Sequence, residues 1–149
     1  MLQEALKLVD QHFPKDAKTT KLQLQLNYYQ TTKNWEQVAK LMGIYTESFG
    51  YENGAFYNQV CWGIYEECDD EETIQQAARW MKKAIEITPD YYFVDTYAAL
   101  LFKGGNLESA KKYALQAIEI GNEGEMDVSY TEELLEKINE AATQPKSTE

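Results

Sequence analysis

The sequence predicts an all-α protein, an α-α superhelix built from about eight antiparallel helices. One observation is an internal repeat, because Ala84-Ile85-Glu86-Ile87 returns as Ala117-Ile118-Glu119-Ile120, an offset of 33 residues from position 84 to position 117. A fixed period of about 20–50 residues is typical of stacked helical repeats. The other observation is that apolar residues follow helical spacing in most segments, while no segment alternates convincingly as a strand would.

Residues 1–14 predict a single helix from Leu2 to His12, which Phe13-Pro14 ends because proline cannot continue a helix. It resembles the second half of a repeat whose first half is missing. Residues 18–50 predict the first complete repeat, with helices over 19–30 and 35–49.

The second repeat is predicted over residues 55–90, with helices at Phe56–Cys68 and Thr73–Ile87. The turn between them is Asp69-Asp70-Glu71-Glu72, whose carboxylates suit the positive N-terminus of the following helix. Pro89 ends the second helix of this repeat.

The third repeat, residues 91–123, predicts helices over 91–103 and 107–120. Gly104-Gly105-Asn106 breaks the first, since glycine tolerates the left-handed conformation at a helix end. Gly121-Asn122 is predicted to end the second. Small residues allow neighbouring helices to approach closely, and we expect four of them to be buried: Ala77, Ala84, Ala110 and Ala117.

A capping helix is predicted over residues 129–142, opened by Ser129-Tyr130-Thr131-Glu132 in the pattern of a capping box. Its inner side carries Leu134, Leu135 and Ile138. Residues 1–142 would then form a single helical repeat domain. The polar tail, 143–149, contains Pro145 and is predicted to be disordered.

This pattern resembles the tetratricopeptide repeat family over about residues 19–123. The matching residues are Gly105, Leu107, Ala110, Ala114 and Ala117, and in the preceding repeat Ala77, Met81, Ala84 and Pro89. The resemblance implies a non-catalytic protein–protein interaction module that binds a peptide or protein segment in a concave groove. Modules of this family that bind acidic chaperone tails use lysines and an arginine in the groove. Here Asn27 alone is similar, so we expect no binding to such tails.

A narrower resemblance covers about residues 58–138. It is carried by Asp95-Thr96-Tyr97-Ala98 and Glu132-Glu133-Leu134-Leu135, and it is to the helical-repeat segment that follows thioredoxin-like domains in certain Bacteroidetes proteins. The Cys-x-x-Cys motif of that family is absent from this chain. The resemblance implies an alternative function, as the accessory helical arm of a larger thioredoxin-family thiol-redox protein.

Charge and composition argue against several other classes of function. A formal net charge of −11 disfavours nucleic acid and anionic membrane surfaces, and no apolar run is long enough to span a bilayer. With one histidine, His12, and no phosphate-binding loop, we expect no enzyme, no metal site and no cofactor. Cys61 and Cys68 lie two helical turns apart, too far for a disulfide between them, and both are expected in the core.

Helical spacing predicts which side chains line the groove: Asn27, Gln59, Trp62, Glu66, Tyr92 and Asp95. Trp62 and Tyr92 are the expected anchors, because aromatic side chains dominate interface energetics. For Trp62, packing against a neighbouring helix is an equally good interpretation. Because Glu66 and Asp95 are acidic, a neutral or basic partner segment fits best.

Two points stay open at the level of sequence. A third function, weak homo-oligomerisation through the N-terminal helix, follows from the apolar edge of Leu6, Val9 and Phe13. The compartment is not fixed, because a native start at Met1 favours the cytoplasm, whereas a fragment of a thioredoxin-like protein would be periplasmic.

Overall fold

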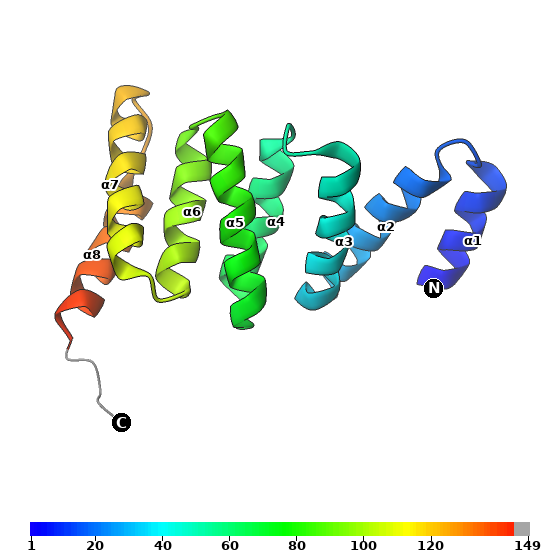
Figure 1. Cartoon of the computed structure of the whole chain (residues 1–149), viewed down its shortest axis with the longest axis horizontal. Coiled ribbons are helices and arrows are strands. Elements are labelled where there is room, and N and C mark those ends of the chain that lie inside the picture. The colour runs from blue at the N-terminus through cyan, green and yellow to red at the C-terminus, as the bar shows by residue number, and fades with distance from the viewer. Residues whose placement is uncertain (145–149) are drawn as a thin grey trace. The chain divides into compact units, whose positions relative to one another are not determined.

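The computed structural model describes residues 1–144, and within them the chain is entirely helical, with eight helices and no strand (Figure 1). This confirms the predicted all-α class. The helices are α1 (Leu2–His12), α2 (Ala17–Thr31), α3 (Trp35–Phe49), α4 (Gly54–Glu67), α5 (Glu71–Ile87), α6 (Tyr91–Lys103), α7 (Leu107–Glu123) and α8 (Ser129–Thr143). Among the described residues, no helix is both long and apolar enough to cross a membrane.

The chain divides into two compact units, Met1–Gly50 and Tyr51–Glu149. The first unit holds α1, α2 and α3, and the second holds the remaining five helices. A single continuous repeat domain over residues 1–142 stays a prediction.

Side-chain caps explain where five of the helices begin. In each case an Asn or Asp at the N-cap accepts a hydrogen bond from a backbone N–H of the first turn, which satisfies a donor that the helix itself leaves free. The capping residues are Asn34, Asn53, Asp70, Asp90 and Asn106. The Asp70 cap confirms that the acidic turn serves the start of α5, and its carboxylate accepts from Thr73 N at 2.8 Å.

The predicted capping box of α8 is wrong. The N-cap is Val128, and the helix begins at Ser129 without a side-chain cap. Asp127 Oδ1 instead accepts from Ser129 N at 3.0 Å. Thr131, which the sequence pattern placed in the box, is fully buried and bonds to another helix.

A glycine ends α6 as predicted, whereas the C-cap of α7 is Gly124 and not the predicted Gly121. Gly105 has φ +80°, a conformation that glycine adopts without steric cost. Gly121, by contrast, lies inside α7, which continues to Glu123. Glu125 takes the left-handed conformation there, and Met126 N donates to Gly121 O at 2.8 Å.

Gly121 has a packing role instead. It is buried where α7 meets α6 and the loop before α8. A Cβ at this position would collide with Val128 Cγ1 and approach Tyr91 Cδ2 to 3.1 Å. The absence of a side chain therefore permits the close approach of these elements.

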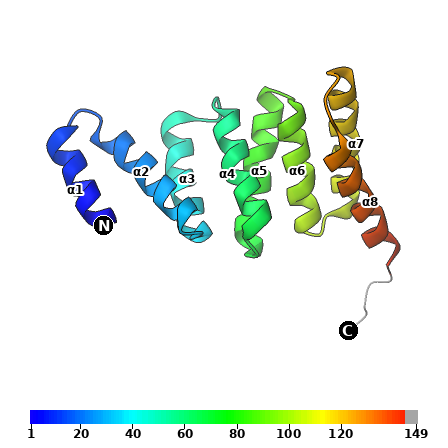
Figure 2. The same cartoon turned by 180° about the vertical axis from the view of Figure 1, so that it is seen from behind.

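In the second unit α6 is the central helix, in contact with α4, α5, α7 and α8. Figure 2 shows α4 and α8 in front, with α6 between them, whereas α5 and α7 lie in front in Figure 1. Eight of the thirteen residues of α6 are buried, which explains its high apolar content. Ala77, Ala84, Ala110 and Ala117 are buried as predicted.

The two cysteines are free and buried, which confirms the core assignment. Burial raises the pKa of the Cys61 thiol far above its usual range, so this side chain stays protonated. In the first unit Val9 is buried, Leu6 is half-buried and Phe13 is exposed. The proposed apolar edge of α1 is therefore smaller than the three residues predicted.

At the C-terminus α8 reaches Thr143, one residue beyond the predicted capping helix. Of the tail predicted to be disordered, residues 143–149, Thr143 is helical, and residues 145–149 lie outside the described residues.

Candidate functional site

Three of the six predicted groove residues line one pocket. Trp62 comes from α4, and Tyr92 and Asp95 come from α6. The pocket has a volume of about 370 Å³, and its other lining residues are Asn58, Tyr91, Thr96, Asp127 and Tyr130. Helices α4, α6 and α8, together with Asp127 in the loop before α8, therefore supply its lining residues.

Four of the eight lining residues are aromatic: Trp62, Tyr91, Tyr92 and Tyr130. Trp62 and Tyr130 meet edge to face with ring centroids 5.4 Å apart, and Trp62 also contacts Tyr65 at 5.1 Å. Tyr92 packs on Tyr91 at 5.1 Å. Tyr92 is 55% exposed and Tyr130 42% exposed, so both rings are available to a partner.

Trp62 packs against a neighbouring core and also lines the pocket, and its role as a binding anchor stays a prediction. It is half-buried and packs against the core formed by α6, α7 and α8, and it also lines the pocket. Packing fixes its orientation, which reduces the entropy that would be lost when a partner binds.

A hydrogen-bonded chain fixes the acidic side of the pocket. Asp95 is only 7% exposed, and Thr131 Oγ1 donates to its Oδ1 at 2.8 Å. Because the ionised carboxylate can only accept, the single Thr131 proton is used there, and Tyr91 Oη donates to Thr131 Oγ1 at 2.8 Å. Burial raises the pKa of the Asp95 carboxyl, and the hydrogen bond from Thr131 opposes that rise.

Two acceptors in this pocket lack protein donors. Asn58 Oδ1 is buried and has no hydrogen-bond partner within the described chain. The Asp95 hydrogen bond uses Oδ1, and no residue that the structure describes donates to Oδ2. Among the described residues that line the pocket there is also no lysine or arginine.

The other predicted groove residues lie elsewhere. Gln59 is exposed on α4, outside this pocket. Glu66 lines a separate pocket with Tyr65, Phe102 and Lys103. Asn27 is exposed on α2 of the first unit, where its backbone carbonyl accepts a hydrogen bond from Thr31 Oγ1. A role for these three in the same groove stays a prediction.

Sequence reasoning missed Tyr130 and Asn58, although spacing could have indicated both. Tyr130, Leu134 and Ile138 follow one another at four-residue intervals, which places Tyr130 on the inner side of α8. Asn58 precedes Trp62 by four residues on α4 in the same way.

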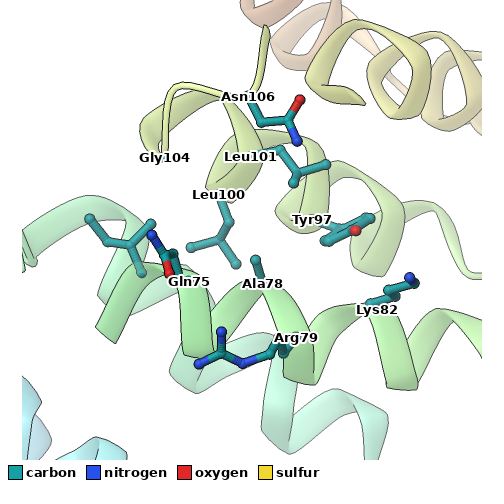
Figure 3. A pocket seen from close by; sticks show the side chains of 10 residues that line it. Gln75, Ala78, Arg79, Lys82, Tyr97, Leu100, Leu101, Gly104 and Asn106 are labelled. Atoms are coloured by element: carbon teal, nitrogen blue, oxygen red, sulfur yellow. The ribbon is translucent and has the colours of Figure 1, made fainter. Parts of the chain in front are cut away.

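A second pocket of about 430 Å³ lies between α5 and α6 (Figure 3). Its floor is apolar, with Tyr97, Leu100 and Leu101 from α6, whereas Arg79 and Lys82 come from α5. The Arg79 guanidinium bonds to Gln76 Oε1 through Nε at 3.2 Å and Nη2 at 2.7 Å. This pocket is therefore basic, opposite in charge to the pocket around Asp95.

Within the described residues, no three or more His, Cys, Asp or Glu side chains come together as a metal site would require. Comparison with known proteins gives no match to this chain among family models, curated proteins or solved structures. The resemblance to tetratricopeptide repeats accordingly stays a prediction.

Proposed function

We propose that this chain is a non-catalytic interaction module of the tetratricopeptide-like superhelical class, which binds a peptide or protein segment in the pocket formed by α4, α6 and α8. The observation that carries the proposal is the pocket itself, with Trp62, Tyr92 and Tyr130 on its walls. Large aromatic side chains that are partly exposed and held by their neighbours are typical anchors of binding surfaces.

The partner segment would contact rings on three helices at once. Tyr92 and Tyr130 offer exposed ring surface, and Trp62, which packs against Tyr130, offers a third ring on the same pocket. In this proposal Glu66 and Gln59 extend the contact along α4, while a role for Asn27, on α2 of the first unit, stays a separate prediction. The partner is neutral or basic, because the carboxylates of Asp95 and Asp127 would repel an acidic segment.

The proposal is tested by selecting peptides from a random display library on the immobilised full chain and measuring their affinity by fluorescence anisotropy. Tyr92→Ala and Trp62→Ala should each weaken the selected peptides by about tenfold or more, the loss expected for an anchor residue. Because Trp62 also packs on the core, circular dichroism must show that its variant is folded. Tyr92 is largely exposed, so its variant tests binding without that complication.

The matched control is Tyr28→Ala, which removes an exposed tyrosine from α2, outside this pocket. It should leave the affinity unchanged. If Tyr92→Ala and Trp62→Ala, when folded, bind the selected peptides as tightly as the unmodified chain, the proposed site is wrong.

Weak self-association through α1 is a second candidate, favoured by the exposed side chains of Leu8 and Phe13. Light scattering over a concentration series tests it. A mass that rises with concentration and falls back with Phe13→Ser supports self-association, and a constant monomer mass rules it out.

A further inference from the structure

We propose that the pocket between α4, α6 and α8 recognises one cationic side chain, a lysine or an arginine, carried by the bound segment. This inference rests on the proposed function and names the feature of the partner that the pocket selects. Three features of the pocket support this inference: its aromatic rings, its acceptors without protein donors and its charge.

The aromatic rings of the pocket can attract a cation. Trp62, Tyr92 and Tyr130 line the same pocket, and Trp62 meets Tyr130 edge to face at 5.4 Å. The faces of aromatic rings carry negative charge, so they attract an ammonium or guanidinium group within about 6 Å of the ring centroid. A small pocket with several such rings therefore favours a cation over an apolar side chain of equal length.

Two hydrogen-bond acceptors in the pocket have no protein donor. Asn58 Oδ1 is buried without a donor, and Asp95 Oδ2 receives no hydrogen bond from the described residues. Both residues line the pocket. A lysine ammonium has three donors and an arginine guanidinium has five, and neither accepts hydrogen bonds. Such a group would supply the hydrogen-bond donors that these two acceptors lack.

Charge comes third. Asp95 and Asp127 line the pocket, and no basic side chain of the described chain balances them there. Burial raises the pKa of Tyr130 most, the neighbouring Tyr65 hydroxyl raises it further, and the charges of Asp95 and Glu66 add a smaller rise. The potential at the pocket is thus negative, whereas the second pocket between α5 and α6 carries Arg79 and Lys82. A cationic side chain is therefore expected here and not there.

The test uses blocked tripeptides with the sequences Gly-Lys-Gly, Gly-norleucine-Gly and Gly-Glu-Gly. Norleucine keeps the four-carbon stem of lysine without its charge. Each peptide is titrated into the ¹⁵N-labelled full chain, and the indole N–H signals are followed. Trp62 reports on the pocket, while Trp80 in α5 and Trp35 in the first unit are internal controls.

The lysine peptide should shift the Trp62 signal saturably and bind about tenfold more tightly than the norleucine peptide. Asp95→Asn, which keeps an acceptor for Thr131, should weaken the lysine peptide by about threefold to tenfold and leave norleucine unchanged. The control is Glu136→Gln, which makes the same change in charge on α8 outside the pocket and should leave both peptides unaffected.

The inference is overturned if norleucine binds as tightly as lysine, if both charge variants weaken lysine equally, or if lysine produces no saturable shift at Trp62. In each of these cases the proposed function is tested separately, by the affinity of the display-selected peptides for the Tyr92 variant. If their binding still depends on Tyr92, the module binds peptides here without selecting a cation. If it does not, the site itself fails.

Discussion

At the scale of single residues, the Asp95–Thr131–Tyr91 chain is the feature on which the site depends. It joins α6 to α8 through two buried hydrogen bonds of 2.8 Å. Removal of the middle member leaves Asp95 Oδ1 without its donor, while Tyr91 Oη keeps only its longer hydrogen bond of 3.4 Å to Asp127 O.

Thr131→Val should therefore lower the free energy of unfolding by about 2–4 kcal/mol, since the hydroxyl is lost while the shape is kept. Thr131→Ser should restore most of that loss, because it returns the hydroxyl. Chemical denaturation measures both variants. Equal stability of the valine variant and the unmodified chain would show that the hydrogen-bonded chain contributes nothing.

Asp95 also makes stability depend on pH. Burial raises its pKa in the folded state above the value in the unfolded chain, so the folded state holds the proton more tightly. Its contribution to stability is complete below the unfolded pKa and is lost as pH rises through the folded pKa. Asp95→Asn, which carries no charge, should thus raise the melting temperature at pH 7, and the difference should shrink as the pH is lowered below the ordinary range of a carboxyl group. A difference that grows on acidification would contradict this explanation.

At the scale of helices, the sequence correctly predicted that all eight helices exist in the described chain, and it predicted most of their boundaries. Asn34, Asp70, Asp90 and Asn106 are N-cap residues whose effect is local, so their pattern can be read along the chain. The failures come from tertiary contacts. The sequence pattern predicts that Gly121 ends a helix, whereas this position requires a glycine because Tyr91 and Val128 approach it closely from other elements.

The same reason limits prediction of the site. Trp62, Tyr92 and Asp95 follow from helical spacing and do meet in one pocket. Thr131 bonds to a residue 36 positions away on another helix, and no local pattern indicates such a pairing. The local pattern around Thr131 favours a capping box, but the residue is buried and forms its hydrogen bond with Asp95 instead.

Gly121→Ala tests the packing role of this glycine. Alanine is the better helix former by about 0.5–1 kcal/mol, so a helix-only effect would stabilise the chain. The new methyl group would instead collide with Val128, and overpacking of this kind costs about 1–3 kcal/mol. We expect a net loss of stability in thermal denaturation. A higher melting temperature would mean that the contact relaxes without cost.

At the scale of the whole molecule, the two units differ in how much of their helices they bury. In α1 only Val9 is buried, whereas α6 buries eight residues at the centre of the second unit. Local opening is easiest where few side chains are buried. Native-state hydrogen exchange should therefore show rapid exchange in α1 and the slowest exchange in α6. Similar protection of both helices would contradict the difference in burial.

The function proposed for the molecule depends on one surface of the second unit. Its rings, acceptors and carboxylates converge from three helices on a pocket of about 370 Å³. The pocket between α5 and α6 instead carries the basic side chains Arg79 and Lys82. The position of a bound segment therefore shows which of the two pockets it occupies.

The most direct test of the central claim is to map a display-selected peptide onto the ¹⁵N-labelled chain by nuclear magnetic resonance. We predict that the indole signal of Trp62 and the side-chain amide signals of Asn58 shift on binding, while the indole signals of Trp35 and Trp80 do not. Shifts confined to the residues around Arg79 and Lys82, with Trp62 unaffected, would show that the pocket between α4, α6 and α8 is not the binding site.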